Sequence, residues 1–210
     1  MTPASDAPVF ENLDWPAKRW IRSNILIDSS GHPAGVDGTS RTLTRGRDRA
    51  LLRLLRQSAD VIVTGGATVR AEGWHFPPNG VLLVVSSSDL PLATCPDPDR
   101  LRVVTPGSST ASVAAALRVA LTQLNATRIL CESGPRLLRT LTDENAIDEV
   151  FVSVVTSDGH LSAPSIRHHD AGFTQAVARH HLRLQSSRYD LIESVNDPGL
   201  TFLRFIRRES

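Results

Sequence analysis

Hydrophobic residues gather in short runs along most of the chain, and stretches with helical character separate these runs. Runs typical of buried strands occupy residues 19–28, 59–66, 81–87, 101–106, 127–134 and 148–156. Between them, helices are predicted for a leucine-striped segment that begins at Thr44, an alanine-rich segment at 112–124 and a proline-initiated segment at 135–145. Strands that alternate with helices indicate a mostly parallel sheet with helices on both faces.

The carboxyl-terminal part of the chain has a different pattern, in which hydrophobic and polar residues alternate. Residues 180–195 and 199–208 both show this alternation, which predicts two strands joined as an antiparallel hairpin. The whole pattern therefore predicts an α/β fold. It would be a three-layer sandwich with a mostly parallel central sheet and a C-terminal antiparallel hairpin at one edge.

The amino-terminal segment lacks any such periodicity. Residues 1–18 contain several prolines and are expected to form a flexible arm. Residues 19–210 contain neither an internal repeat nor a linker-like stretch, so we expect them to form one domain.

Composition and charge narrow the classes of protein. Hydrophobic residues make up 40% of the 210 residues and charged residues 21%, which suits a globular domain with a sizeable core. The formal net charge is only +1, so an arginine-rich nucleic-acid binder and an anionic-membrane partner are both disfavoured.

Several features predict a cytoplasmic protein. Cys95 and Cys131 are the only cysteines and are expected to be free thiols of a reducing compartment. No apolar run reaches the roughly 18 to 20 residues of a membrane span. The amino terminus has neither the basic nor the apolar region of a signal peptide.

Two predicted strands run directly into turns that contain glycine. Their sequences are VIVTGGATVRAE and ILCESGPRLLRTL. Ligands of open α/β sheets bind at the carboxyl ends of strands, beside helix amino termini, where free amide groups can hold a pyrophosphate. Neither turn has the three spaced glycines of the dinucleotide fingerprint or the Gly-Lys-Ser/Thr of a P-loop. An ordinary strand-to-helix turn is therefore the alternative interpretation of each.

Taken together, the motifs GG-x-T-V-R-x-E and E-x-G-P-x-L-L, the second followed by Ile-Asp-Glu-Val, resemble those of the pyrimidine reductase family of riboflavin biosynthesis. The resemblance extends from about residue 19 to the carboxyl terminus and includes SNILIDSSG, GTSRTLT and VLLVVSSSDLPL. It implies a dihydrofolate-reductase-like fold and an NADPH-dependent oxidoreductase. The implied substrate is a pyrimidine, such as a ribosylaminouracil phosphate, or a pterin-like small molecule.

The resemblance also implies which residues form the site. Residues that would contact NADPH are Thr64, Gly65, Gly66, Thr68, Glu72, Ser86, Ser87, Gly134, Pro135, Arg136, Leu137 and Leu138. Residues that would contact the phosphorylated substrate are Ser40, Arg56 and Glu132. Asp28 and Glu132 are the candidate catalytic carboxylates, although a turn cap after the first strand is an equal alternative for Asp28.

The sequence departs from the family pattern at three places. Ser30 replaces the aspartate of the family's Ser-Leu-Asp-Gly, and Ser133 replaces the first of two glycines. GWHFPPNG replaces a Leu-Thr-Val-Arg segment. These departures leave a second hypothesis open, a nucleotide-binding family member that has lost catalysis.

Other features concern metals and partners. The zinc-deaminase signature of H-x-E with P-C-x-x-C is absent. The pairs His168-His169 and His180-His181 have no cysteine or carboxylate at ligand spacing, so no metal site is expected. The terminal hairpin would leave an exposed edge with apolar alternation, and we expect a homodimer to cover it.

Overall fold

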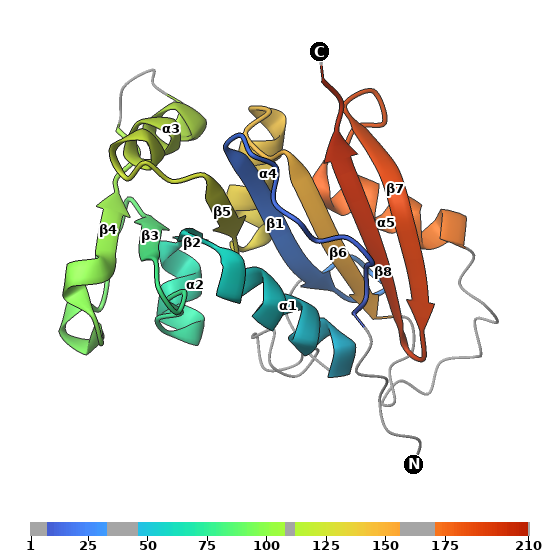
Figure 1. Ribbon diagram of the computed structural model, residues 1–210, viewed down its shortest axis with the longest axis horizontal. Helices are drawn as coiled ribbons and strands as arrows, with labels where there is room; N and C mark the ends of the chain where they lie inside the picture. The colour runs from blue at the N-terminus through green and yellow to red at the C-terminus, as the bar shows by residue number, and fades with distance from the viewer. Residues whose placement is uncertain (1–7, 33–45, 108–111, 156–170, 210) are drawn as a thin grey trace.

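The computed structural model describes residues 8–32, 46–107, 112–155 and 171–209 (Figure 1). The strands are β1 (Trp20–Ile27), β2 (Val61–Gly65), β3 (Val81–Val85), β4 (Leu101–Val104), β5 (Arg128–Cys131), β6 (Glu149–Val155), β7 (Tyr189–Asp197) and β8 (Leu200–Arg207). The helices are α1 (Gly46–Ser58), α2 (Gly66–Glu72), α3 (Val113–Gln123), α4 (Pro135–Asp143) and α5 (Ala171–Leu182), with short 3₁₀ turns η2 (Leu92–Thr94) and η3 (Pro98–Arg100).

All the strands belong to one eight-stranded sheet with the order β4-β3-β2-β5-β1-β6-β8-β7. The pairs from β4 to β6 are parallel, and β8 is antiparallel to both β6 and β7. The predicted mostly parallel sheet with a carboxyl-terminal antiparallel hairpin is therefore confirmed. Pro198 and Gly199, the latter with a φ of 81°, form the turn of the hairpin.

Helices cover both faces of the sheet and give the predicted three layers (Figure 1). One core cluster joins the sheet to α3, α4 and α5, through residues such as Leu117, Leu138 and Leu182. The other joins the opposite face to α1 and α2, through Leu51 and Val69. None of the helices in the described ranges is long and apolar enough to cross a membrane.

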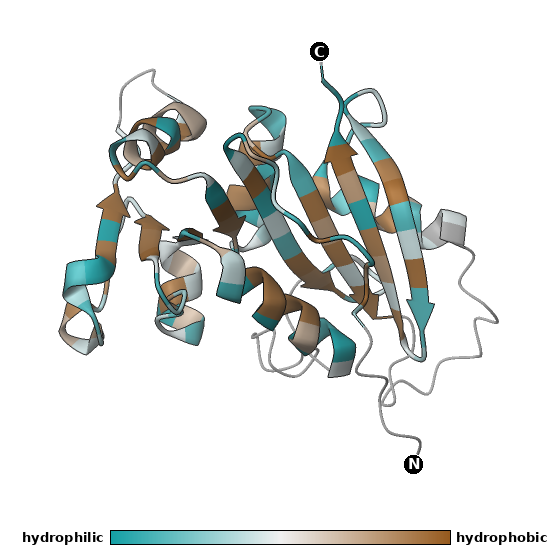
Figure 2. Cartoon of the chain, viewed as in Figure 1, coloured by the Kyte–Doolittle hydropathy of each residue, from teal (hydrophilic) through white to brown (hydrophobic). Residues whose placement is uncertain are grey.

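Hydropathy follows the position of each strand in the sheet. Every residue of the interior strand β6 is buried, whereas the edge strand β7 mostly alternates between exposed and half-buried residues. Figure 2 accordingly shows hydrophobic residues along the central strands and more hydrophilic ones on β7. A strand covered on both faces reads as a continuous apolar run, which is why the central strands could be predicted.

The structure corrects the start of the first hairpin strand, β7. Residues 180–188, predicted to lie in a strand, contain the end of α5 and the loop after it. Leu182 and Leu184 are both buried at a spacing of two, which imitates the pattern of a strand. Arg183 between them has a φ of 56°, and the Leu184 amide donates to the Arg179 carbonyl oxygen at 3.0 Å. This Schellman-type ending returns the chain to the core directly after the helix.

The described part of the amino-terminal segment also differs from the expected flexible arm. Val9 and Phe10 are buried against the α1 face of the sheet, in the same cluster as Leu51. The guanidinium of Arg22 on β1 donates to the carbonyl oxygens of Leu13 and Asp14, each at 2.7 Å. Residues 8–18 therefore have defined contacts although they form no helix or strand.

Candidate active site

A cleft opens on the α1 face of the sheet, between α1, α2 and the start of α4. It encloses about 770 Å³, including space open to solvent. Its lining comes from the second half of β1, from α1, and from the segments that follow β2 and β5. Ligands of α/β sheets collect at such carboxyl ends of strands.

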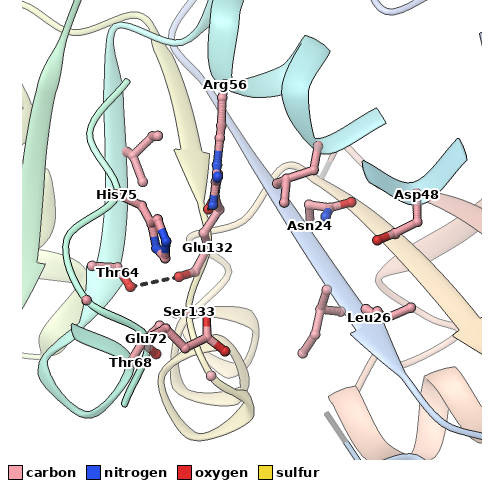
Figure 3. Close-up of a pocket in the computed structure, with 15 residues that line it drawn as sticks. Asn24, Leu26, Asp48, Arg56, Thr64, Thr68, Glu72, His75, Glu132 and Ser133 are labelled. Atoms are coloured by element: carbon pink, nitrogen blue, oxygen red, sulfur yellow. Dashed lines mark hydrogen bonds and ion pairs between the residues drawn. The ribbon is translucent and has the colours of Figure 1, made fainter. Parts of the chain in front are cut away.

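The two glycine-bearing turns predicted from the sequence lie side by side in this cleft. Strands β2 and β5 are parallel neighbours, with Val63 opposite Cys131. The Glu132 amide donates to the Val63 carbonyl oxygen, and the Thr64 hydroxyl donates to the Glu132 carbonyl oxygen, each at 2.8 Å (Figure 3). These bonds fix the start of one turn against the start of the other.

Three glycines lie at these turns, and an added Cβ atom would have different surroundings at each. A Cβ placed on Gly134 would lie 3.7 Å from the Thr68 hydroxyl oxygen, and one on Gly65 would lie 4.0 Å from the same oxygen. Both are ordinary contacts, so the protein itself has room for a methyl group at each position. A Cβ on Gly66 would lie 2.2 Å from the Ser86 hydroxyl oxygen, so Gly66 is required by packing against the end of β3.

The start of α4 offers unused amide groups. Gly134 is the N-cap of this nine-residue helix, and no side chain caps it. Pro135 follows as the first helical residue, so the first free donors are the amides of Arg136 and Leu137. A helix amino terminus with open amides carries partial positive charge and suits an anion such as a phosphate.

Arg56 and Glu132 form an ion pair in the cleft. Arg56 lies in the last turn of α1, and its Nε donates to Glu132 Oε1 at 2.7 Å while its Nη2 donates to Oε2 (Figure 3). Burial works to lower the pKa of Arg56, but the hydrogen bonds and charge of Glu132, with the charge of Glu72, raise it overall. Arg56 is thus held charged inside the cleft, not on a solvated helix face.

The other residues predicted for the cofactor are divided between the cleft and its surroundings. Thr64, Thr68, Glu72 and Gly134 line the cleft. Leu137 packs near Gly65, where its Cδ2 would lie 3.8 Å from an added Cβ.

Eight predicted cofactor residues are not among those that line the cleft: Gly65, Gly66, Ser86, Ser87, Pro135, Arg136, Leu137 and Leu138. Leu138 is fully buried in the core beneath α4, and Arg136 is exposed. The Ser86 hydroxyl donates to the Ser88 carbonyl oxygen at 2.8 Å, and Ser87 is exposed beyond it. Ser40, predicted for the substrate, lies outside the described residues.

Asp28 lies in the turn after β1 and is not among the described residues that line the cleft. Its Oδ1 accepts hydrogen bonds from the amides of Ser30 at 2.8 Å and His32 at 2.9 Å. This geometry is that of the turn cap considered as the alternative to a catalytic carboxylate.

Sequence reasoning missed three polar residues that line the cleft: Asn24 on β1, Asp48 on α1, and His75 after α2. Asn24 is the last of three polar residues in a mostly buried strand, directly before the apolar end of that strand, and this was the one available signal. Asp48 is in the first turn of an arginine-rich helix, where an acidic residue is ordinarily explained by the helix dipole.

Ser133, one of the departures from the family pattern, is buried under the second turn. Its hydroxyl oxygen lies 3.3 Å from the sulfur of Cys131. Burial raises the pKa of the Cys131 thiol to about 11. The thiol is therefore protonated at neutral pH and serves as a packing group beside this serine.

The fold and the cleft define a class of protein, the dihydrofolate-reductase-like α/β proteins. The sequence pattern of the RibD C-terminal domain matches residues 19–157, and the chain belongs to this family. No curated protein sequence matches the chain significantly.

Solved structures with the same fold include RibD of Acinetobacter baumannii, with 18% identity, a TM-score of 0.65 and coverage of 91% of this chain and 58% of that chain. A pyrimidine reductase-like protein of Corynebacterium diphtheriae has 19% identity, a TM-score of 0.63 and coverage of 91% and 93%. Dihydrofolate reductase of Enterococcus faecalis, complexed with NADP(H), has 14% identity, a TM-score of 0.53 and coverage of 90% and 97%. The chain thus spans little more than half the length of the Acinetobacter protein.

Proposed function

We propose that the chain is an NADPH-dependent reductase that acts on a pyrimidine bearing a ribosyl phosphate, as in riboflavin biosynthesis. The observation that carries this proposal is the meeting of two glycine-bearing turns and the Arg56–Glu132 pair in one cleft. Such a cleft can bring a dinucleotide and a charged small molecule together. Membership of the RibD C-terminal domain family supports the same reaction class.

The residues at the two turns fit a dinucleotide. Gly65 and Gly134 leave free space on either side of Thr68, and the uncapped start of α4 offers amides to a pyrophosphate. When bound, NADPH supplies the hydride. The chain's own contribution is to hold the cofactor's phosphates at α4 and to leave room for the reacting ring in the cleft.

Arg56 and Glu132 fit the phosphate and ribose side of a substrate. Glu132 accepts hydrogen bonds from Nε and Nη2 of Arg56. A guanidinium held in the cleft by a carboxylate is well suited to bind a phosphate oxygen. The Glu132 carboxylate, mostly buried, can also accept a hydrogen bond from a ribose hydroxyl.

The direct test is to mix the purified full chain with NADPH and ribosylaminouracil phosphate and to follow NADPH oxidation by absorbance. We expect oxidation that depends on both components. Binding of NADPH without turnover on a panel of pyrimidine and pterin substrates would instead support the nucleotide-binding protein without catalysis. No binding of NADPH would refute the proposal itself.

We also propose that the protein is a homodimer that associates through the hairpin. Strand β7 forms one edge of the sheet, and Ile192 on it is 49% exposed. An unpaired edge with exposed apolar side chains favours pairing with a second copy. Light scattering is expected to give the mass of two chains, and Ile192→Lys should shift it to one. A single-chain mass for the parent protein would contradict this.

A further inference from the structure

A second cavity lies away from the cleft, on the face of the sheet that α3, α4 and α5 cover. It encloses about 620 Å³, including space open to solvent. Its lining comes from the start of β1, from α3, from the loop between α4 and β6, and from the end of β8. Figure 1 shows these strand ends together at one end of the sheet. The cavity shares no described lining residue with the cleft, so it is a separate feature.

Positive charge dominates the lining of this cavity. Arg19, Arg118 and Arg207 line it, and Asp148 is the one acidic residue among its described lining residues. Three arginines against one aspartate leave two positive charges unbalanced, in a chain whose formal net charge is only +1. The arginines come from distant parts of the sequence, and the fold brings them together. A concave surface lined by one sign of charge attracts ions of the other sign.

Arg19 is fixed by the end of α3. Its Nε donates to the Ala126 carbonyl oxygen at 2.9 Å, and its Nη1 donates to the Thr122 hydroxyl at 3.0 Å. A cation at the carboxyl end of a helix is stabilising, so this arginine has a structural role. Its charge nevertheless remains beside the cavity.

Arg207 is paired less completely. Its Nη2 donates to Asp148 Oδ1 at 2.5 Å, while Asp148 Oδ2 accepts a hydrogen bond from the Ile21 amide at 2.8 Å. Arg207 Nε is buried and has no hydrogen-bond partner in the described part of the chain. Buried polar atoms are nearly always paired, so this donor requires an explanation. The side chain is 31% exposed, and a small rotation of the guanidinium would bring Nε to an anion in the cavity.

Apolar side chains form the floor beneath these charges. Leu117, Arg118 and Leu121 have the spacing of one helix face on α3. The two leucines are buried, and Arg118 is exposed at the rim. Ile21 and Ala146 are half-buried and pack in the same core cluster as the leucines. A cationic rim over an apolar floor suits an anion with an apolar body better than it suits a bare ion.

We propose that this cavity is a second ligand site, which binds a small organic phosphate. The phosphate would contact Arg118 and Arg207, and an apolar or aromatic body would lie over α3. A phosphomonoester carries nearly two negative charges at neutral pH, which matches the two unbalanced positive charges. Guanidinium groups bind phosphate oxygens through charge-assisted hydrogen bonds. The inference goes beyond the proposed reductase function and does not depend on it.

Phenyl phosphate is a suitable probe, with inorganic phosphate and benzyl alcohol as comparators. NMR titration of the full chain without NADPH would locate the binding and give the dissociation constants. We expect phenyl phosphate to shift the amide signals of residues 19–21 and 114–121. It should bind at least about fivefold more tightly than inorganic phosphate, because the ring covers the apolar floor. Benzyl alcohol, which has no charge, should not bind measurably.

Variants assign the binding to the two arginines. Arg118→Gln, and Arg207→Lys, which keeps a charge beside Asp148 and removes the fork, should each raise the Kd for phenyl phosphate at least about fivefold. The control Arg102→Gln removes an exposed positive charge on β4, outside the lining, and should change the Kd by less than about twofold. Thermal unfolding checks that each variant is folded. Arg118 is exposed, so Arg118→Gln provides the test if Arg207→Lys is not folded.

Three results would overturn the inference. Phenyl phosphate that binds no more tightly than inorganic phosphate, or that loses as much affinity in Arg102→Gln as in Arg118→Gln, would indicate unspecific attraction to positive charge. Binding that is lost in Arg56→Ala and retained in Arg118→Gln would place the phosphate in the cleft. Failure of the proposed reductase function would appear separately, as absence of NADPH binding, because these titrations contain no cofactor.

Discussion

Two carboxylates are buried on the same face of the sheet, and their surroundings are opposite. Glu149 on β6 accepts hydrogen bonds from Trp20 Nε1 at 2.8 Å, Arg22 Nε at 2.7 Å and Arg204 Nε at 2.6 Å. Asp48 on α1 has an oxygen with no partner among the described residues. Glu149 lies at the start of its strand, whereas Asp48 borders the cleft.

The difference distinguishes an element of the fold from an element of the site. Around Glu149 the protein supplies every donor itself, and Arg22 also ties down the amino-terminal segment through the Leu13 and Asp14 carbonyl oxygens. Such a network rigidifies the structure. At Asp48 one oxygen, Oδ1, has no partner among the described residues, which is typical of positions where a ligand completes the bonding.

The comparison predicts the largest loss of stability at Glu149. Glu149→Ala should lower the free energy of unfolding by about 3–5 kcal/mol, because it leaves two buried guanidinium groups without their carboxylate. Chemical denaturation monitored by circular dichroism would measure the change. The exposed pair of Lys18 and Glu209 provides the control, and Glu209→Ala should have no measurable effect. If Glu149→Ala lowered the free energy of unfolding as little as Glu209→Ala does, the network around Glu149 would not be the stabilising element described here.

At the cleft, the main effect of changing Arg56 should be on substrate binding. Arg56→Ala is expected to raise KM for the phosphorylated substrate roughly ten- to a hundredfold, because a charge-assisted contact to the phosphate is lost. The Kd for NADPH should change little. Arg56→Lys should recover only part of the loss, since an ammonium lacks the planar fork. Steady-state kinetics would measure both constants. Equal KM values for Arg56→Ala and the parent protein would show that Arg56 has only a structural role, as the partner of Glu132.

Replacing the Asp48 carboxylate should raise the free energy of unfolding, whereas replacing Glu149 should lower it. Burial raises its pKa in the folded protein, so the stability contributed by its protonated form is present below the unfolded pKa, near 4, and is lost as the pH rises through the folded pKa. Asp48→Asn should therefore stabilise the unliganded protein at pH 7 by about 1–3 kcal/mol. The gain should fade below about pH 4. Urea denaturation at pH 7 and below about pH 4 would measure both changes. A variant that is less stable than the parent protein at pH 7 would contradict this prediction.

Asp60, just before β2, should make the smallest contribution to stability, and its pKa is shifted downward, as is usual for a carboxylate with hydrogen-bond donors. Burial opposes ionisation, but hydrogen bonds from the side chain and amide of Arg128 and from Thr127 lower the pKa of Asp60 to about 2. Its contribution to stability is present above about pH 4 and lost as the pH falls toward 2. Because this pair is partly exposed, Asp60→Asn should cost only about 1 kcal/mol at pH 7 and almost nothing near pH 2. A cost independent of pH would show that the shape of the side chain, not its charge, matters.

The sequence was informative where the cause of a feature is local. Strands such as β6 are continuous apolar runs because both their faces are covered, and the glycine turns after β2 and β5 could be recognised from their residues alone. Arg56 was predicted for the cleft through the family resemblance, and it does lie there. The end of α5 was predicted as a strand because Leu182 and Leu184 imitate strand spacing across a helix end, and no element was predicted for residues 171–179.

Features that depend on pairing in three dimensions could not be predicted. Whether a buried carboxylate is satisfied depends on donors from distant segments, as for Glu149 with Arg204, or on their absence, as for Asp48. Gly66 was attributed to the approach of the cofactor, yet its contact with Ser86 across the end of β3 is sufficient to require glycine. Gly134, with space at its Cα, is the better probe of the cofactor.

The central claim is that the two glycine-bearing turns hold the dinucleotide, and calorimetric titration of NADPH into the parent protein and Gly134→Leu tests it most directly. The bulky side chain would fill the space beside Thr68 and obstruct the free amides of α4, while the thermal unfolding of the unliganded variant shows whether it is folded. We expect the parent to bind NADPH and folded Gly134→Leu to bind it at least about tenfold more weakly, a change of about 1.4 kcal/mol in binding free energy. Equal affinity of the two folded proteins for NADPH would contradict the account.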